Sequence, residues 1–335
     1  MNKILARFLF CLALTGAPLG AASAADLPVL TVYTYNSFVS DWGPGPQVKK
    51  AFEAECACRI DFVGVEDGVV LLSRLRLEGA SSKADVVLGL DTNLTAEAAA
   101  TGLFAPHGLD LSALKLPLEW KDQDFVPYDF GYFAFVWDTT RLKNPPKSLA
   151  DLVGGGGTEK ILIEDPRSST PGLGLLLWIK QVYGDRAAEV WRQLRPRVLT
   201  VSKSWDEAYG LFLKGEAPMV LSYTTSPAYH IIAEKKTQYA ADNFPEGHYL
   251  QVEVAGVTAH APHPELARKF LQFMLSTKFQ DVIPETNWMY PAAATSSGLP
   301  AAFPPLPGKS LMIPSDEVAK NRKAWIDEWL AAMSQ

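Results

Sequence analysis

Three places in the chain put serine or threonine where a helix is expected to begin, and this pattern could serve ligand binding. They are Ser169–Thr170, Ser204 and Thr225–Ser226. A helix N-terminus carries unpaired N–H groups and partial positive charge, so helix starts that face one cleft could hold a phosphate or another anion. Ordinary helix capping explains each of them just as well. Trp205 and Tyr223 lie beside two of the three, which favours a shared binding cleft.

An acidic turn and several aromatic residues could bind a cation. Asp67 and Gly68 follow an expected strand, and a carboxylate both attracts a cation and accepts hydrogen bonds from an amine. The simpler interpretation of Asp67 is an N-cap for the helix that begins at Gly68, and one residue can do both. Aromatic faces hold organic cations with gains of roughly 0.5–2 kcal/mol per contact. The candidates for such faces are Tyr35, Trp205, Tyr223 and Trp288.

Residues 1–24 have the features of a secretion signal. Lys3 and Arg7 are basic, the run from Phe8 to Leu14 is apolar, and Ala22–Ala24 offers a small-x-small cleavage site. The apolar run is too short to span a bilayer, and no other stretch of the sequence is long and apolar enough. We therefore expect a cleaved signal and a soluble, extracytoplasmic mature chain.

Charge and cysteine content narrow the function classes. Loss of the two positive charges in residues 1–24 takes the formal charge from -6 to -8. An acidic chain without a long basic run argues against nucleic acid as a partner. Cys56 and Cys58 remain, and an oxidising compartment favours a small local disulfide between them. A zinc site would need more ligands at suitable spacing, whereas a catalytic thiol stays open as an alternative.

Strands and helices alternate along the first part of the chain. Expected strands cover 29–35, 59–65 and 84–90, and expected helices cover 47–55 and the residues from 68 onward. The third strand is almost wholly apolar, as in a parallel sheet covered on both faces. This alternation predicts a doubly wound α/β fold.

Two long extended segments, 125–137 and 248–257, are expected to cross between two such lobes. We predict lobe 1 from residues 25–127 plus 250–298 and lobe 2 from 128–249 plus 299–335, with hinges in the crossing segments. Further helices are expected at 170–183, 205–215 and 315–333. Their predicted N-caps are Thr170, Ser204 and Ser315.

Long stretches of the mature chain resemble one family, the bacterial thiamine-binding periplasmic proteins. The segments that carry the resemblance are VLTVYTYNSFVSDWGPGP, VEDGVVLLSRLRLEG, KADVVLGLD, FVPYDFGYFAFV, DPRSSTPGLGLLLW, SYTTSPAYH, EGHYLQVEVA and NWMYP. It implies the type II periplasmic binding protein fold and a solute-binding component of an ABC importer. Such a protein would bind thiamine, and its mono- and diphosphate, by lobe closure and deliver it to the permease in the inner membrane. It implies no cofactor and no metal.

The resemblance also assigns ligand contacts. The residues it implies are Tyr35, Asp67, Gly68, Ser169, Thr170, Trp205, Tyr223, Thr224, Thr225, Ser226 and Trp288, with Trp42 as a further candidate. One position departs from the family, because Asn36 stands where an aspartate is expected. An asparagine supplies no charge, so Asp67 or Glu66 is expected to do more to balance a cationic ligand.

Two other functions compete with this interpretation. A thiaminase-like enzyme would need a nucleophile with a base in reach, and once Cys11 is lost with the signal only Cys56 and Cys58 of the mature chain offer a thiol. A carrier of the same fold for ferric ion or another small molecule is the second. Tyr223, Tyr229 and His230 lie close in sequence, but Tyr229 and His230 are expected inside a helix, and no tandem tyrosine pair is present. We expect a binding protein rather than an enzyme.

Overall fold

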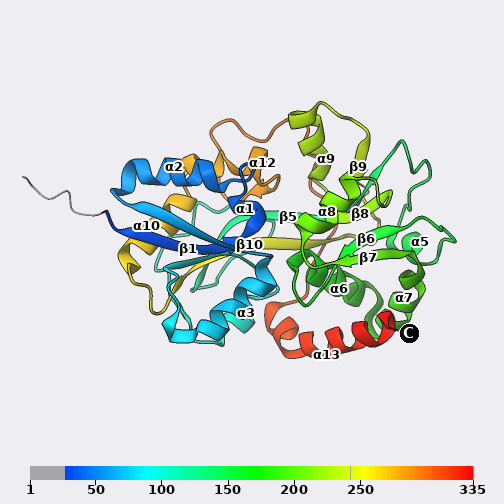
Figure 1. The fold of residues 1–335 in the computed structure, drawn as a ribbon, viewed down its shortest axis with the longest axis horizontal. Helices are drawn as coiled ribbons and strands as arrows, with labels where there is room; N and C mark the ends of the chain where they lie inside the picture. Colours follow the sequence, from blue (N-terminus) through cyan, green and yellow to red (C-terminus); the bar gives the residue numbers. More distant parts are fainter. Residues whose placement is uncertain (1–26, 242, 335) are drawn as a thin grey trace, which may run out of the picture.

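One continuous sheet runs through both halves of the protein (Figure 1). Its strands follow the order β2-β1-β3-β10-β5-β8-β6-β7. The computed structural model describes residues 27–241 and 243–334, so the expected signal at 1–24 lies outside the described residues. In the described part, no helix has the length and apolar character needed to cross a membrane.

The first lobe is a parallel sheet with helices on both faces. Its strands are β1 (Val29–Tyr35), β2 (Arg59–Val65) and β3 (Val86–Asp91), with the short β4 (Phe104–Ala105) at an edge. Figure 1 shows α2 and α3 on opposite sides of these strands. The helices are α1 (Asn36–Val39), α2 (Gly45–Cys56), α3 (Gly68–Glu78), η1 (Gly79–Ser81), α4 (Thr95–Ala99), α10 (Pro264–Met274), α11 (Thr277–Gln280) and α12 (Ile283–Thr286).

The second lobe repeats the arrangement with other strands. They are β6 (Ile161–Glu164), β7 (Val198–Ser202), β8 (Met219–Tyr223) and β9 (Tyr239–Ala241), and β6 lies parallel to both β7 and β8. Its helical segments are α5 (Leu149–Gly154), α6 (Thr170–Tyr183), η2 (Gly184–Arg186), α7 (Ala187–Leu194), η3 (Arg195–Arg197), α8 (Trp205–Leu213), α9 (Ser226–Tyr229) and the π-helical η4 (His230–Glu234).

Two long antiparallel strands join the lobes. They are β5 (Phe125–Asp138) and β10 (His248–Thr258), and every residue in both is buried. The first half of β5 pairs with β10, and its second half pairs with β8 in the other lobe. The predicted crossing strands and the doubly wound α/β class are therefore confirmed. The chain closes with β11 (Tyr290–Pro291), β12 (Ser310–Leu311) and α13 (Ser315–Met333).

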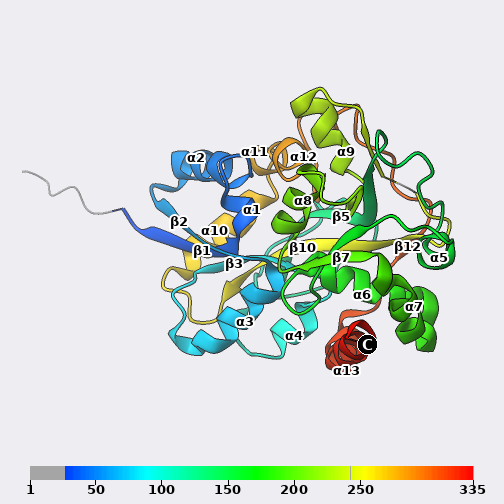
Figure 2. The ribbon, with the colours of Figure 1, turned by 45° about the vertical axis from the view of Figure 1, so that its right-hand side comes forward.

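The exact division into lobes stays a prediction. Helix α13 contacts α7 and α6 of the second lobe and also α4 of the first. The turned view in Figure 2 shows α13 below α6 and α7, in line with those contacts. The last residues therefore tie the second lobe to the first outside the crossing strands.

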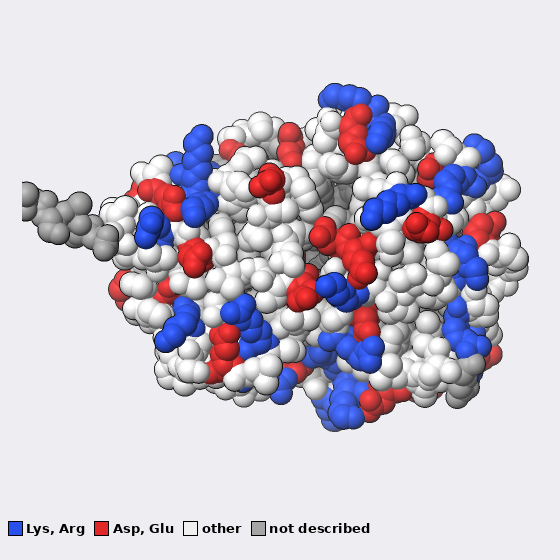
Figure 3. All heavy atoms as spheres, viewed as in Figure 1, with Lys and Arg blue, Asp and Glu red and all other residues white. Residues whose placement is uncertain are grey.

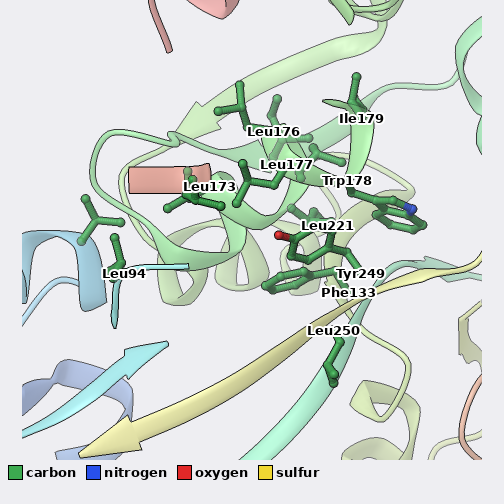
Figure 4. Packing of buried hydrophobic residues seen from close by; sticks show 14 of the residues in the cluster. Leu94, Phe133, Leu173, Leu176, Leu177, Trp178, Ile179, Leu221, Tyr249 and Leu250 are labelled. Carbon is green, nitrogen blue, oxygen red and sulfur yellow. The ribbon is translucent and has the colours of Figure 1, made fainter. Parts of the chain in front are cut away.

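Helix α6 packs its apolar side onto the long strands. Figure 4 shows Phe133, Leu221 and Tyr249 between this helix and the strands. Gly174 makes the close approach possible, because a Cβ there would lie 2.0 Å from the ring of Phe133. The tight contact fixes the start of α6, and with it the serine and threonine that the sequence analysis singled out.

Two of the predicted helix caps are wrong by one residue. Ser169, not Thr170, caps α6, and its hydroxyl accepts the Gly172 N–H. Ser315 is the first residue of α13 and not its cap, since Pro314 occupies the cap position. A residue that caps a helix through its side chain typically has extended backbone, as Ser169 has, whereas Thr170 is already part of the helix. The cap at Ser204 is confirmed, for its hydroxyl accepts the Glu207 N–H.

Candidate functional site

A cleft lies between the two lobes, above the crossing strands. It encloses about 250 Å³, just below the usual range of small-molecule pockets, roughly 300–1,000 Å³. Residues from both lobes and from the β10 floor line it. The predicted residues that line it are Tyr35, Asp67, Thr170, Trp205, Tyr223, Ser226, Trp288 and also Trp42.

The other predicted residues lie behind the cleft surface. Gly68 faces the backbone of Gly89 and the methyl group of Thr170, and Ser169 is fully buried. Thr224 donates its N–H to the Tyr132 carbonyl, and Thr225 is also fully buried. None of these four residues lines the cleft, and each lies next in sequence to a residue that does or to another of the four. Asn36, where the family resemblance led us to expect an acid, opens the short helix α1 and does not line the cleft.

Asp67 joins the two lobes. Its Oδ1 accepts the Gly68 N–H at 2.8 Å and the Thr170 hydroxyl at 2.6 Å. Its Oδ2 accepts the Ser169 hydroxyl at 2.8 Å and, at 3.5 Å, the Trp205 N–H. The N-termini of α3, α6 and α8 therefore meet at one carboxylate, which fills the anion position that helix starts create. Burial raises the pKa of Asp67 against these hydrogen bonds, which lower it.

This arrangement changes the role expected for Asp67. Both of its oxygens already accept hydrogen bonds from the opposite lobe, so it acts as a contact that holds the lobes together. The nearby Glu66 and Lys203 form an exposed ion pair at 3.6 Å across the same boundary. An exposed pair of this kind contributes only about 0–1 kcal/mol. Across this boundary the buried network of Asp67 is therefore a stronger polar contact than the exposed pair.

Aromatic rings form the walls of the cleft. Trp205 stacks on Tyr209 with centroids 5.0 Å apart and an interplanar angle of 20°, and its indole N–H donates to Ser222 Oγ at 2.8 Å. Trp42, half exposed, lies 6.4 Å from Trp205. On the other side Tyr229 meets Trp288 edge to face at 5.3 Å. Such paired rings suit a flat, cationic or aromatic ligand.

The backbone of Trp288 is strained. Its φ of 56° lies in the left-handed region, which costs a bulky residue free energy. Backbone of this type concentrates at binding sites, where the surrounding structure holds it in place. With this backbone conformation Trp288 lines the cleft beside Tyr229.

The acidic floor of the cleft was not predicted from the sequence. Glu253 in β10 lines it, and Asp129 in β5 lies directly opposite as its register partner. Tyr35 donates its hydroxyl to Glu253 Oε2 at 3.1 Å, and Asn287 donates to both carboxylates. The sequence held a signal for them, because Glu253 is the lone acid of β10 and Asp129 is the one acid inside the apolar run of β5, whose only other acid is its last residue, Asp138. Tyr209 and Tyr229 also line the cleft and were not predicted as ligand contacts, although they lie only four and three residues from the predicted Trp205 and Ser226.

The charge of the cleft has one sign. Its acidic lining residues are Glu66, Asp67, Asp206 and Glu253, and no lysine, arginine or histidine of the described chain lines it. Figure 3 shows acidic side chains gathered at the middle of this face, between the two lobes. Among the described residues, no group of three or more His, Cys, Asp or Glu side chains is placed to hold a metal ion. The acidic lining therefore suits a ligand of positive charge.

Cys56 and Cys58 form a disulfide at the end of α2, with their Cα atoms 5.1 Å apart. Neither residue lines the cleft. Their sulfur atoms are bonded to each other and lie outside the site, so they support the fold of the α2–β2 turn.

Comparisons with known proteins agree with this geometry. Residues 44–281 match the family of bacterial extracellular solute-binding proteins. The thiamine-binding periplasmic protein of Brucella melitensis is 60% identical over 322 residues, which cover 95% of this chain and 96% of that protein. The solved structure of a periplasmic thiamin binding protein is 59% identical, with a TM-score of 0.90 over 92% of this chain and 97% of that one.

A more distant structure supports the fold alone. The periplasmic binding protein AfuA from Actinobacillus pleuropneumoniae has a TM-score of 0.77 at 18% identity, over 92% of this chain and 99% of that one. The predicted type II periplasmic binding protein fold is therefore confirmed. The chain belongs to the bacterial extracellular solute-binding proteins, and its near relatives among them are thiamine-binding periplasmic proteins.

Proposed function

We propose that this protein binds thiamine in the cleft between its lobes as the solute-binding component of an importer. The observation that carries the proposal is a cleft with aromatic walls, four lining carboxylates and no basic side chain among its described residues. The thiazolium ring of thiamine carries a permanent positive charge, which such a cleft attracts. The names of relatives about 60% identical over nearly the whole chain support the same ligand.

The rings and hydroxyls suggest how the ligand lies. The thiazolium and aminopyrimidine rings would contact Trp205, Tyr223 and Trp288, which line the cleft from both sides. The hydroxyethyl tail would point toward the N-termini of α6 and α8. In this orientation the cation lies over the carboxylates of the floor.

The mono- and diphosphate of thiamine belong to the same proposal. Their phosphates would reach the helix N-termini where Asp67 now accepts its hydrogen bonds. Asp67→Asn removes that negative charge, so the variant should shift selectivity from thiamine toward the phosphates. Competition calorimetry with the three ligands checks this. An unchanged order of affinities in the variant would place the phosphates elsewhere.

A binding protein releases its ligand unchanged, in contrast to a thiamine-cleaving enzyme. The thiols that such an enzyme would need are joined in the disulfide, outside the cleft. We propose that the chain is secreted to the periplasm by residues 1–24 and delivers its ligand to an ABC permease. Closure of the lobes around the ligand would present the form that the permease recognises.

Two measurements test the function directly. Isothermal titration of the mature protein with thiamine should give one site per chain. Mass spectrometry of the ligand after incubation should recover intact thiamine. The absence of binding would refute the proposed carrier, whereas cleavage products would favour the enzyme.

A further inference from the structure

The floor of the cleft carries a row of three carboxylates on neighbouring strands. Asp91 in β3 and Asp129 in β5 are the register partners of Glu253 in β10, one on each side. Glu253 is 6% exposed, and the other two are fully buried. Only Glu253 lines the cleft, and Asp129 supports it from the adjacent strand. Two of the three carboxylates therefore lie in the strands that join the lobes, β5 and β10, and the third lies in β3, which pairs with β10.

No basic side chain balances this row. None of the ion pairs between described residues includes Asp91, Asp129 or Glu253. Asp91 is satisfied locally, for it accepts the backbone and side-chain N–H groups of Asn93 at 3.0 Å. The other titratable groups that face the pair of Asp129 and Glu253 are Tyr35 from β1, Asp67 from α3, Tyr128 from β5 and Tyr223 from β8.

One oxygen of the pair of Asp129 and Glu253 has no hydrogen-bond donor. Glu253 Oε2 accepts from Tyr35 at 3.1 Å and from Asn287 at 3.2 Å, and Asp129 Oδ2 accepts from Asn287 at 2.6 Å. Asp129 Oδ1 is buried, and no N–H or O–H of the described chain donates to it. A proton on Glu253 Oε1 supplies this donor. Two neighbouring carboxylates in a buried site cannot both ionise cheaply, so one shared proton fits the geometry.

We propose that Glu253 and Asp129 hold one proton between them in the ligand-free protein, and that a cationic ligand displaces it. On binding, the O–H bond of Glu253 breaks, the proton passes to water or buffer, and the pair faces the ligand with both carboxylates ionised. The fixed charge of the ligand replaces the charge of the lost proton. The pair is then the counter-ion of the cation and selects for a permanent positive charge.

The directions of the pKa shifts of Asp129 and Glu253 agree with a shared proton. Burial raises the pKa of Asp129. Burial and the negative charge of Asp129, together with the hydrogen bond between the two, raise the pKa of Glu253 well above its usual range. The hydrogen bond raises the pKa of Glu253 and lowers that of Asp129, which makes Glu253 the donor. Near neutral pH the pair is therefore protonated once until a nearby cation lowers the pKa of the Glu253 carboxyl.

This inference rests on the proposed function, because thiamine supplies the fixed cation. The test is titration calorimetry of the whole mature protein with thiamine at pH 7, in phosphate and in Tris. These buffers differ in ionisation enthalpy, so the difference in heat counts the protons released. We expect release approaching one proton per site, and an affinity that rises up to tenfold per pH unit between about pH 6 and 8. A neutral thiophene isostere of thiamine should release none.

Three variants locate the proton. D129N/E253Q keeps the shape of the pair and should abolish both the release and the pH dependence of affinity. D67N and D91N each remove another buried carboxylate and should keep the proton count, although D67N weakens binding. Thermal unfolding establishes that each variant is folded.

The outcomes separate the inference from the function on which it rests. Thiamine binding with the same heat in both buffers would overturn the proton pair and leave the carrier intact. Release that persists in D129N/E253Q, or disappears in D67N or D91N, would assign the proton to another group and also overturn it. If thiamine failed to bind in any buffer, the carrier function and the inference would both fall.

Discussion

The indole of Trp205 has two kinds of contact that a smaller residue cannot make. It stacks on Tyr209 and anchors its N–H on Ser222, so one face is free to line the cleft. Trp205→Ala removes that face, and the loss of a cation–aromatic contact worth about 0.5–2 kcal/mol should weaken thiamine binding roughly 2- to 30-fold. Calorimetric titration measures the change.

A matched tryptophan outside the cleft provides the control. Trp325 in α13 is also partly buried, but it packs beside Lys180 of α6 and does not line the cleft. Trp325→Ala should lower stability and leave affinity unchanged. Equal affinity in Trp205→Ala and the wild type would remove Trp205 from the site.

At this scale the sequence predicts residues that lie in loops and helix starts better than residues inside strands. Trp205 and Thr170 stand beside turn and cap signals, which reveal where backbone groups are exposed. Glu253 and Asp129 lie in apolar strands that read as core, and only the register between β5 and β10 brings them together. The role of Asp67 depends on the opposite lobe, because its partners are about 100 residues away along the chain.

The start of α6 combines a helix cap with a contact between lobes. Ser169 accepts the Gly172 N–H and donates to Asp67. Ser148 caps α5 in the same way, through the Asp151 N–H, and is not hydrogen-bonded to Asp67. Ser169→Ala and Ser148→Ala should each cost about 1 kcal/mol of unfolding free energy, but only Ser169→Ala should also weaken thiamine binding.

Urea denaturation and titration of both variants separate the two effects. A loss of affinity in Ser148→Ala equal to that in Ser169→Ala would show that stability alone controls binding. An unchanged affinity in Ser169→Ala would show that the bond to Asp67 does not contribute to closure.

For whole elements, sequence patterns predict the strands well and the helix ends less well. The crossing strands stand out because fourteen residues of β5 are buried without interruption, which needs an apolar run longer than an ordinary strand. The cap of α6 lies in Ser-Ser-Thr-Pro, where more than one residue could cap and sequence alone does not decide. Gly174 against Phe133 fixes the position of the helix, and this contact depends on the packed fold.

We expect closure of the whole protein to depend on Asp67. Its buried hydrogen bonds to Ser169 and Thr170 connect the two lobes. Asp67 accepts the two hydroxyl groups on two different oxygens, and in asparagine one of these oxygens is replaced by an amide nitrogen, which cannot accept. Asp67→Asn should therefore shift the ligand-free protein toward an open form. Small-angle scattering should show a larger radius of gyration. Lys203→Ala removes only the exposed ion pair with Glu66 and should scatter like the wild type. An Asp67→Asn variant with an unchanged radius of gyration would show that Asp67 does not hold the lobes together.

Buried titratable groups set how the stability of the fold changes with pH. Burial raises the pKa of Asp91 to about 7, and the pKa values of Asp129 and Glu253 also rise. An acid whose pKa is raised by folding contributes stability at low pH, and this stability is lost as pH rises through the folded-state pKa. Burial lowers the pKa of His248, so that residue contributes stability above about pH 6.5 and loses it as the pH falls.

The buried acids outweigh the buried histidine, so the ligand-free protein should lose stability as the pH rises. Above the ordinary carboxyl pKa of about 4 the folded chain keeps protons on Asp91 and on the pair of Asp129 and Glu253 that the unfolded chain has lost, whereas below about pH 6.5 the unfolded chain binds one extra proton at His248. We expect Tm to fall from about pH 5 to about pH 8.5. D129N/E253Q keeps only Asp91 of the three buried acids at the cleft floor, so its Tm should fall less. Calorimetric scans from pH 5 to 8.5 check both curves, and a wild-type Tm that rises throughout this range would show that the acids of the floor are ionised in the folded protein.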